Sequence, residues 1–261
     1  MCRCKIKLKQ VNKKPIKLKY MHELMQGMIY QMPSKETSKR LHERGIRSLL
    51  DTRRLFKEVA FSTLRAPRYE ILNDGKEIRF NDDVFFYLAS PDEEILRELV
   101  EKIAFSPEIK IGDARFIPII DTRGDVLENC MLDIDVDVFD NEKTVLDCFT
   151  ITPIVVSDSF RDKDGRQKTK FYYPDKKAFY EKVTNNLKNK FSAYYKTNDL
   201  SKFHFNIACY NFKLKGVYYK NTLLIGSEGN FRLETNYETA KVINAFGLGA
   251  KNAQGLGQVM F

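Results

Sequence analysis

The sequence predicts an α+β protein of two tandem ferredoxin-like (RRM-like) domains, each with the element order βαββαβ. Three observations predict this class. A length of 261 residues is enough for one large or two ordinary domains, and a hydrophobic content of 43% supports a folded core. Segments that alternate like strands are separated by segments with helical spacing. The order of elements in the first half then recurs in the second.

The first half reads as a strand, two helical pieces, two strands, a helix and a last strand. Residues 4–8 alternate charged and apolar side chains, with Ile6 and Leu8 on one face, as in a half-buried strand. Ser34 can cap the second helical piece, and Gly45 fits its exit. The ranges expected are 4–8, 21–31, 34–44, 57–63, 77–88, 91–103 and 109–120.

The second half repeats this order. In residues 132–138, aspartates alternate with apolar side chains, which predicts a strand with one apolar face. A second strand at 144–156, a long helix at 178–195, two strands at 203–210 and 212–225 joined near Asn211, and a helix at 236–246 follow. We expect an N-terminal domain at 1–120 and a C-terminal domain at 125–261, packed together because no low-complexity linker separates them.

The C-terminal segment 247–257 places two Gly-Leu-Gly triplets around Lys251. Glycine permits positive φ and close approach of the backbone, so paired triplets indicate a loop whose amides face an anion such as phosphate. The simpler interpretation is a helix exit followed by the final strand. The spacing fits neither a dinucleotide-binding turn nor a P-loop, so we expect no nucleotide cofactor.

Charge and cysteine content narrow the class of partner. A formal net charge of +9 favours an anionic partner, although a basic soluble protein would have the same charge. The five cysteines form neither a disulfide framework nor a Cys-x-x-Cys zinc spacing, which is typical of reduced thiols in the cytoplasm. No apolar run has the length of a signal core or a membrane span, so we expect no membrane partner.

Of the three histidines, His42 is the best candidate for proton transfer. It lies in the last turn of a predicted helix, near Arg40, Arg44 and Arg47. A histidine beside a basic surface can take or give a proton while a ribose 2′-OH attacks the adjacent phosphate. An exposed histidine at a helix end is the alternative interpretation. Of the other two histidines, His22 is expected to be structural or merely exposed, and His204 to be a satisfied histidine within a strand.

Two further patterns have a functional and a structural interpretation. Asp133, Asp135 and Asp137 could form an acidic metal cluster, but carboxylates spaced by two on a strand better suit a solvated sheet face. We therefore expect no metal site. Basic and aromatic side chains interleave in residues 161–173, including Lys168 and Lys170. This stretch either binds an RNA backbone or forms a charged hairpin tip that leads into a core strand.

These motifs together resemble the CRISPR repeat-processing endoribonucleases, the Cas6 family of the RAMP superfamily. Gly247-x-Gly249, five residues and Gly255-x-Gly257 resemble the glycine-rich signature of that family, and Leu41-His42 with Gly45 resembles its Leu-His-x-x-Gly segment. Further matching segments contain Tyr30, Phe61-Ser62, Thr152-Pro153 and Asn186-Leu187-x-x-Lys190.

The resemblance implies two ferredoxin-like domains and metal-independent cleavage of precursor CRISPR RNA within its repeats. His42 would be the general acid or base, Tyr30 a partner at the scissile phosphate, and Arg47 the third, basic residue; Arg53, Arg54 and Lys57 are alternatives for that last role. The RNA-binding residues would be Gly247, Gly249, Lys251, Asn252, Gly255, Gly257, Arg53, Arg54, Lys168 and Lys170. The resemblance implies no cofactor.

The partners expected are precursor CRISPR RNA and, after cleavage, subunits of an interference complex. The sequence leaves open whether the chain forms a homodimer. Two other functions remain open. One is a non-catalytic RNA-binding subunit of the same fold, and the other is a metal nuclease that uses the acidic cluster of residues 133–137.

Overall fold

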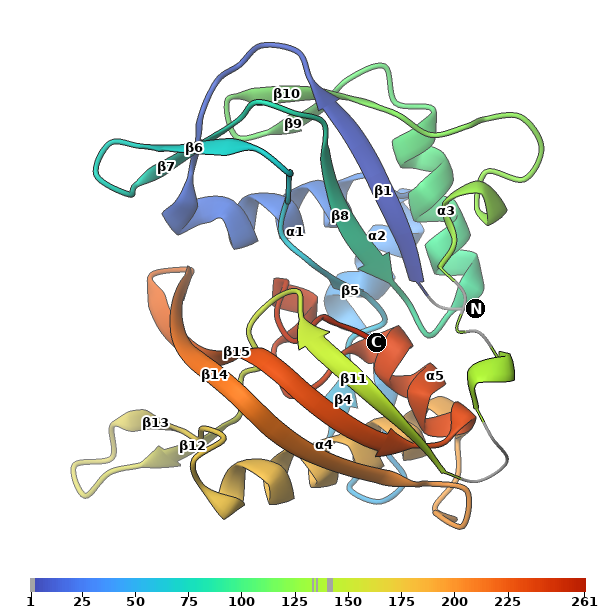
Figure 1. The fold of residues 1–261 in the computed structure, drawn as a ribbon, viewed down its shortest axis with the longest axis vertical. Helices are drawn as coiled ribbons and strands as arrows, with labels where there is room; N and C mark the ends of the chain where they lie inside the picture. Colours follow the sequence, from blue (N-terminus) through green and yellow to red (C-terminus); the bar gives the residue numbers. More distant parts are fainter. Residues whose placement is uncertain (1–2, 133, 135, 140–142) are drawn as a thin grey trace.

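The chain forms two antiparallel sheets, each with helices packed on one face, as Figure 1 shows. The computed structural model describes residues 3–132, 134, 136–139 and 143–261. The first sheet has the order β5-β8-β1-β10-β9 and the second has the order β14-β15-β11-β16. In both sheets the first strand of the unit lies between the third and the last strand, which is the ferredoxin-like arrangement.

The first unit contains five sheet strands and three helices. The strands are β1 (Arg3–Gln10), β5 (Ala60–Phe61), β8 (Val84–Ala89), β9 (Ile109–Ile111) and β10 (Ala114–Pro118); the helices are α1 (Met21–Gln31), α2 (Lys35–Glu43) and α3 (Glu93–Ala104). Asp92 caps α3 by accepting hydrogen bonds from the amides of Glu94 and Ile95.

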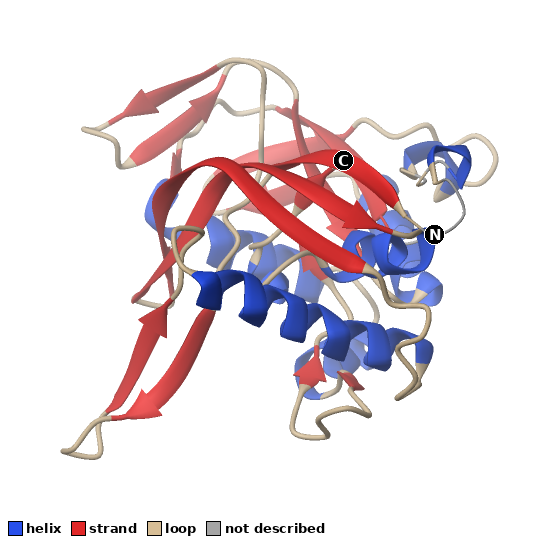
Figure 2. Ribbon diagram, turned by 60° about the horizontal axis from the view of Figure 1, so that its bottom comes forward, coloured by secondary structure: helices blue, strands red, loops and turns tan. Residues whose placement is uncertain are grey.

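The second unit contains four sheet strands and two helices. They are β11 (Thr144–Thr150), α4 (Lys177–Tyr195), β14 (Phe205–Tyr219), β15 (Thr222–Thr235), α5 (Tyr237–Phe246) and β16 (Val259–Met260). Asn236 caps α5 through the amide of Thr239. Both units therefore have the predicted order βαββαβ, and Figure 2 shows the long helix α4 lying along the second sheet.

Three small β-structures extend from these two frames. A three-stranded sheet has the order β2-β7-β6, and two hairpins are formed by β3 with β4 and by β12 with β13. Their bounds are β2 (Ile16–Lys17), β3 (Ile46–Arg47), β4 (Leu55–Phe56), β6 (Tyr69–Leu72), β7 (Glu77–Phe80), β12 (Ser157–Arg161) and β13 (Gln167–Phe171). The β12–β13 hairpin projects from the body at the lower left of Figure 1. Among the described residues there are also four short 3-10 helices, η1 (Leu18–Tyr20), η2 (Glu128–Cys130), η3 (Val136–Val138) and η4 (Asn252–Gln254).

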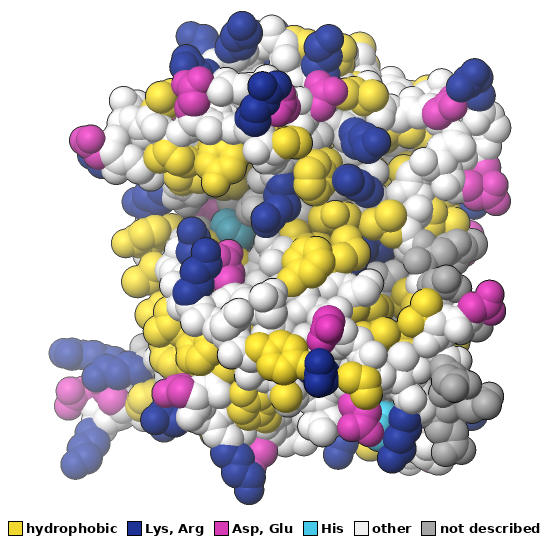
Figure 3. Space-filling view, viewed as in Figure 1, with side chains coloured by type: hydrophobic (Ala, Val, Ile, Leu, Met, Phe, Trp, Pro, Cys, Tyr) yellow, Lys and Arg dark blue, Asp and Glu magenta, His cyan; other side chains and the backbone are white. Residues whose placement is uncertain are grey.

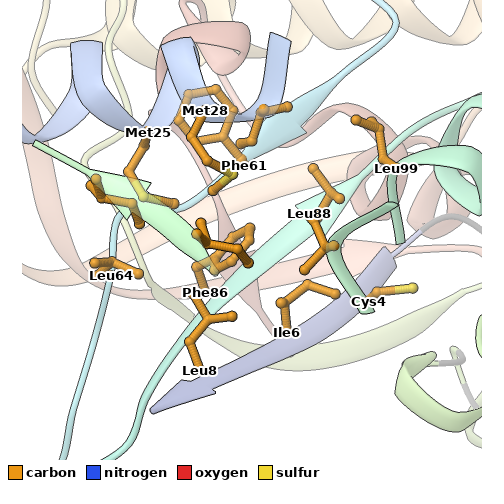
Figure 4. Packing of buried hydrophobic residues seen from close by; sticks show 14 of the residues in the cluster. Cys4, Ile6, Leu8, Met25, Met28, Phe61, Leu64, Phe86, Leu88 and Leu99 are labelled. Carbon is orange, nitrogen blue, oxygen red and sulfur yellow. The ribbon is translucent and has the colours of Figure 1, made fainter. Parts of the chain in front are cut away.

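Each unit has its own hydrophobic core. In the first, side chains from β1, β8 and α1 interdigitate, as Figure 4 shows for Ile6, Phe86 and Met25. In the second, Phe179, Phe191 and Phe231 are the buried phenylalanines from α4 and β15 that belong to the cluster. Burying a large apolar side chain contributes about 1.5–3 kcal/mol, so each core can stabilise its own unit.

Polar contacts connect the two units. Arg3 in β1 is 2% exposed, and its guanidinium donates hydrogen bonds to the carbonyl oxygens of Val259 at 2.7 Å and Asn244 at 3.4 Å. Ser48 donates to Asn189 Oδ1 at 2.8 Å, which attaches the loop after β3 to α4. The two units therefore pack together, as expected.

The connection between the units packs on the first core. Val126, Leu127 and Cys130 belong to the cluster of the first unit, and the amide of Leu132 donates to the carbonyl oxygen of Arg3 at 2.9 Å. The placement of the domain boundary between residues 120 and 125 stays a prediction.

Several predicted strands are wrong because turns interrupt them. Residues 77–88 form two strands, because Asn81, Asp82 and Asp83 make a polar turn between β7 and β8. Residues 109–120 form a hairpin that turns at Gly112, with φ +62°. Residues 57–63 contribute only the two-residue β5, and the strand predicted at 144–156 ends at Thr150.

The predicted strand break near Asn211 is also wrong. β14 continues through Asn211 with a bulge, and the chain reverses at Lys220 and Asn221, both of which have positive φ. Two central residues with φ > 0 are typical of a type I′ hairpin turn. Asn211 was misread because a polar residue in a strand can mark a bulge as well as a turn.

The predicted strand at 132–138 is wrong in its described part, because Val136–Val138 is a 3-10 helix. Asp133 and Asp135 lie outside the described residues. Gly45 is not a left-handed helix exit. It follows an extended Arg44, and a Cβ there would lie 2.5 Å from the carbonyl oxygen of Phe56, so the glycine permits close packing of the β3–β4 hairpin. No helix within the described ranges is long and apolar enough to cross a membrane.

Candidate functional site

Tyr30 and His42 are neighbours in the structure. The two rings meet edge to face, with centroids 4.7 Å apart and planes at 66°. Tyr30 is buried on α1 and His42 is exposed at the end of α2. Burial raises the pKa of Tyr30 to about 12, helped by the neighbouring Tyr219. The pair thus combines a hydroxyl that stays protonated at neutral pH with an imidazole open to solvent.

Helix α2 is held firmly against the first unit. Ser34 caps it by accepting from the amide of Thr37, and Ser38 donates to the carbonyl oxygen of Tyr30 at 2.7 Å. Arg40 makes a two-pronged ion pair with Glu58 at 2.9 and 2.7 Å and a third bond to Asp92 at 2.5 Å. These carboxylates raise the pKa of Arg40. Charge-assisted bonds of this kind fix geometry, so the place of His42 is well defined.

Lys57 is the basic residue that the structure brings to the end of α2. Its ammonium donates to the carbonyl oxygen of His42 and to that of Arg44, the latter at 3.0 Å. Burial lowers the pKa of Lys57. Arg47 instead donates to the carbonyl oxygen of Thr52 within its own loop. The described contacts therefore connect Lys57, and not Arg47, to the residue that carries the imidazole.

A groove of about 850 Å³ begins at Lys57 and runs to the glycine segment. Leu55 and Phe56 from β4, Phe160 from β12 and Ala250 to Gln254 from the C-terminal segment line it. A smaller cavity of about 160 Å³ continues along α4, and Arg54 lines both. The groove therefore has walls from both units, and Arg54, Lys57 and Lys251 are among the residues that line it.

The four glycines of the C-terminal segment shape a loop. All four have positive φ, between +67° and +82°, and all four are buried. A Cβ at Gly255 would lie 2.8 Å from Phe61, and one at Gly257 would overlap the carbonyl oxygen of Leu248. These positions therefore accept only glycine, because both the conformation and the space exclude a side chain.

The buried side chain of Lys190, on α4, forms hydrogen bonds with this loop. This side chain is 1% exposed, and its ammonium donates to the carbonyl oxygens of Gly247 at 2.8 Å and Gly249 at 2.7 Å and to Asn252 Oδ1 at 2.8 Å. Burial lowers the pKa of Lys190 to about 7. The three acceptors oppose this decrease, because they match the three N–H donors of the charged form. Three acceptors of the glycine loop are therefore hydrogen-bonded to the same atom, the Lys190 ammonium nitrogen.

The outer edge of the loop presents free donors. Asn252 is occupied internally, since its amide nitrogen donates to the carbonyl oxygens of Leu248 at 3.1 Å and Leu256 at 2.9 Å. The backbone amides of Lys251, Asn252 and Ala253, in contrast, donate to no acceptor in the part of the chain that the structure describes. Lys251 has a left-handed backbone and an exposed side chain. Successive free amides in such a turn form a concavity suited to an anion.

The other predicted RNA-binding residues are spread over the surface. Arg53 is exposed and pairs with Asp51 at 3.0 Å, while Arg54 lies 3.6 Å from the same carboxylate and faces the groove. Lys168 and Lys170 are exposed on β13. Lys168 pairs with Asp162 at 3.0 Å, and Lys170 lies over the Tyr172 ring, 5.3 Å from its centroid. The structure therefore brings Arg54, but not Arg53, to the groove, and places the two lysines on the projecting hairpin.

The remaining candidates have structural partners. His22 is buried, with Nδ1 2.8 Å from the carbonyl oxygen of Gln254, and burial lowers its pKa. His204 Nε2 lies 3.0 Å from Glu234. The four described cysteines are free thiols. Over the described ranges, no three His, Cys, Asp or Glu side chains gather as metal ligands would; this leaves Asp133 and Asp135 untested.

The sequence analysis gave no role to Lys190 or to Gln26, whose Nε2 donates to the carbonyl oxygen of Ala253 at 2.6 Å, and it named Lys57 only as an alternative to Arg47. Lys190 was noted only as a motif position, and its spacing from the glycines, more than fifty residues, gives no sign of contact. Its one signal was an isolated lysine within the apolar stripe of a helix, because a lysine is almost never fully buried without a partner.

The fold and this site define a class of proteins with two ferredoxin-like units and a C-terminal glycine-rich loop. A family model described as CRISPR associated protein Cas6, C-terminal, matches residues 135–261, and one described as CRISPR-associated protein Cas6, N-terminal, matches residues 15–119. The chain belongs to the Cas6 family.

Two curated relatives agree with this assignment. The chain is 27% identical over 206 residues to CRISPR-associated endoribonuclease Cas6 1 of Methanocaldococcus jannaschii, a match that covers 78% of this chain and 74% of the relative. It is also 27% identical to an endoribonuclease-like Cas6 protein of Pyrococcus furiosus over 200 residues, 76% of each chain. A solved RAMP protein described as binding different RNA substrates has the same fold, with a TM-score of 0.77 over 99% of this chain at 22% identity.

Proposed function

We propose that this chain is an endoribonuclease that cleaves precursor CRISPR RNA within its repeats. The observation that carries the proposal is the Tyr30–His42 pair, which Lys57 connects through the His42 carbonyl oxygen to a groove that the glycine segment also lines. The relative from Methanocaldococcus jannaschii is named an endoribonuclease, and both family models are of CRISPR-associated proteins. A non-catalytic RNA-binding subunit is not favoured, because it would need no exposed histidine on a helix that charge-assisted bonds of Arg40 hold in place.

The chemistry uses the nucleophile that RNA carries. The ribose 2′-oxygen forms a bond to the adjacent phosphorus while the bond to the 5′-oxygen breaks, which leaves a 2′,3′-cyclic phosphate and a 5′-hydroxyl. One proton leaves the 2′-hydroxyl and one reaches the 5′-oxygen, and His42 performs one of these transfers. The protein then needs only alignment, proton transfer and stabilisation of developing negative charge, so the step requires no metal ion.

Tyr30 and Lys57 assist His42 in this proposal. The Tyr30 hydroxyl, protonated up to a pKa of about 12, donates to a phosphate oxygen and keeps the imidazole in place through the edge contact. The Lys57 ammonium supplies positive charge next to the histidine. Arg47 was predicted for this last role, but its contact with Thr52 makes it the weaker choice.

The RNA backbone follows the groove toward the C-terminal unit. Arg54 and Lys251 neutralise phosphates along the way, and the free amides of Lys251 to Ala253 bind one phosphate oxygen. Gly247, Gly255 and Gly257 are too buried to bind RNA directly, so they act by shaping the loop. Lys168 and Lys170 on the hairpin contact RNA outside the groove.

One experiment tests the proposal against its alternatives. Labelled repeat RNA is incubated with the protein in EDTA, and the products are separated and treated with acid and phosphatase to detect a cyclic phosphate. We expect cleavage at one position and a cyclic end. Binding without cleavage would indicate a non-catalytic subunit. Cleavage that EDTA abolishes would indicate a metal nuclease that uses the acidic residues at 133–137.

A further inference from the structure

Asparagine side chains of α4 line the cavity of about 160 Å³ that adjoins the groove, called the side cavity below. Its wall also contains two backbone segments, residues 155–158 and 249–250. Asn186 lines both the side cavity and the groove. The side cavity therefore lies next to the path proposed for the RNA backbone, and Asn186 belongs to the wall that the two share. The polar side chains around the side cavity are Arg54, Ser157, Asp158, Lys182, Asn185, Asn186 and Asn189.

Asn186 differs from the neighbouring polar side chains in its hydrogen bonds. Asn189 Oδ1 accepts a hydrogen bond from the Ser48 hydroxyl at 2.8 Å, and the Asp158 carboxylate pairs with the Lys182 ammonium at 2.5 Å. Asn186 Oδ1, in contrast, is buried and has no hydrogen-bond partner among the residues that the structure describes. The Asn186 amide is therefore available to a ligand, whereas Asn189 and Asp158 have structural partners.

The unpaired oxygen determines which kind of group can bind to Asn186. A buried acceptor without a partner lowers stability, because it has lost its hydrogen bond to water. Rotation about χ2, which is broad for asparagine, can turn the amide toward the side cavity, and Oδ1 gives up no hydrogen bond in the turn. The partner that Oδ1 lacks is a donor. A phosphate diester offers only acceptors, so the RNA backbone in the groove cannot supply that donor.

A nucleobase fits the side cavity better than a ribose hydroxyl does. Val155 and Val156 are buried, line the side cavity and offer an apolar contact for the flat face of a base. An amide has an acceptor beside two donors, and adenine has an amino group beside a ring nitrogen, so the two can form a pair of hydrogen bonds. Unpaired bases of single-stranded RNA can turn out of the stack and bind in this way. Arg54, which lines the groove and the side cavity, supplies positive charge for the phosphate of the same nucleotide.

We propose that the side cavity binds one unpaired adenine of the RNA, and that the Asn186 amide recognises the edge of this base through two hydrogen bonds. The inference rests on the proposed function, because it requires that RNA follows the groove, but it does not require cleavage. The amides of the glycine loop bind the backbone of any RNA, whereas Asn186 adds a preference for a base at one position. Asn186 is thus a residue that determines specificity.

The test is an abasic scan of repeat RNA, in which each nucleotide in turn lacks its base. Affinity is measured with and without Asn186→Leu, and all proteins also carry His42→Ala so that the RNA stays intact. We expect one adenosine at which loss of the base weakens binding by about 5-fold to 10²-fold, the discrimination that one amide–base pair provides. Asn186→Leu should weaken binding of intact RNA by a similar factor and should have no further effect on the RNA that lacks this base.

An atomic substitution in the RNA tests the bond to Asn186 directly. Unsubstituted purine in place of the sensitive adenine lacks only the amino group, so affinity should fall when Asn186 is present and stay constant with Asn186→Leu. Leucine is a good helix former, so we expect α4 to stay folded, and Asn186→Asp, which keeps the size of the side chain, is a second variant for the same measurement. Asn198→Leu, at an exposed position just after α4, is the matched control and should bind every RNA like the parent protein.

Several results would overturn the inference. One is unchanged affinity with Asn186→Leu, and another is a loss that is equal for the intact RNA and for every abasic RNA. Coupling of Asn186 to a base other than adenine would overturn the assignment of adenine, and coupling to a 2′-deoxy substitution would show that the side cavity binds a ribose. If the wild type binds repeat RNA without cutting it, the proposed cleavage fails while the scan still tests Asn186. If the wild type does not bind the RNA, both proposals fail.

Discussion

The two ferredoxin-like units share one sheet frame but differ in the segments that connect each helix to the next strand. In the first unit, the connection from α1 to β5 contains α2 and the β3–β4 hairpin, whereas in the second unit α4 leads through a short connection to β14. After the last helix of each unit, the second unit has the more elaborate connection. α3 is followed by the small β9–β10 hairpin, and α5 by the glycine loop. The insertions, and not the sheets, therefore distinguish the two units.

The two insertions also differ in exposure. His42 is open to solvent on a helix held by partly buried ion pairs, while the glycine loop is buried around Lys190 and exposes only its outer edge. A group that transfers a proton must reach the substrate, and a loop that binds a backbone must keep its shape. Figure 3 shows a third surface, the open sheet faces, where hydrophobic side chains and scattered basic ones are exposed. Phe149 on β11 and Tyr210 and Leu214 on β14 are exposed.

The substitution with the largest expected effect tests whether the first unit carries the residue that cleaves RNA. His42→Ala should lower the single-turnover cleavage rate by about 10²–10⁴-fold, the usual contribution of a general acid or base, while RNA affinity stays within a few-fold. His204→Ala is the matched control, because that histidine pairs with Glu234 in the second unit. Undiminished cleavage by His42→Ala would remove His42 from the mechanism.

The substitution with the next largest expected effect tests whether the glycine loop of the second unit binds RNA. Gly257→Ala places a methyl group against the Leu248 carbonyl at a left-handed position, so we expect a distorted loop, a lower midpoint of thermal unfolding and RNA affinity reduced by at least about tenfold. Gly75→Ala also has positive φ, +83°, but open space around it, so it controls for backbone strain alone. Equal RNA affinity for the two variants would contradict a specific role for the loop.

A smaller effect sharpens the assignment of the third catalytic residue. Lys57→Ala should lower the cleavage rate by about 10–10²-fold, because a cation beside the histidine is lost from a partly desolvated site. Arg47→Ala should have little effect, since Arg47 contacts its own loop. Measurement of both rates at saturating RNA compares them directly. The reverse order of effects would restore Arg47 to the role that the sequence resemblance gave it.

The buried lysine makes the second unit sensitive to pH. The folded-state pKa of Lys190 is lowered to about 7 from 10.5, so between these values the unfolded chain binds more protons than the folded chain. The free energy of unfolding should therefore gain a contribution that rises with pH from about 7 to 10.5. Denaturation of the wild type and Lys190→Met across this range measures it, because the difference in slope isolates Lys190. Parallel slopes would show that Lys190 keeps its proton throughout.

The fold was largely predictable, because local patterns determine it. Alternation identified β1, and Ser34 and Asn236 gave the helix starts that the structure has. Turns were harder to predict. Asn211 is polar and lies in a bulge, whereas the real reversal at Lys220 and Asn221 has no glycine or proline to mark it.

The site was only half predictable, for a related reason. His42 and the glycines could be proposed from the sequence because each has a chemical signature that is visible alone. Lys190, Gln26 and Lys57 act through contacts with distant backbone carbonyls, and a carbonyl has no residue identity that could pair with them in the sequence. Arg47 was favoured over Lys57 because it is closer in sequence to His42, but the β3–β4 hairpin returns Lys57 to the end of α2.

The prediction with the smallest expected effect tests whether RNA binds to the second unit only in the groove or also on the projecting β12–β13 hairpin. Lys168 and Lys170 are exposed on β13, and each phosphate that a lysine neutralises adds about 0.7 to the salt dependence of single-stranded RNA binding. The double variant Lys168→Ala/Lys170→Ala should therefore reduce the slope of log affinity against log salt by about 1.4, with the rate at saturating RNA unchanged. Lys13→Ala/Lys14→Ala, an exposed pair in the turn after β1, removes the same charge elsewhere and should leave the slope nearly constant. If both double variants change the slope equally, the hairpin lysines contribute only through the net charge of the protein. Specific RNA binding would then be confined to the groove and the glycine loop.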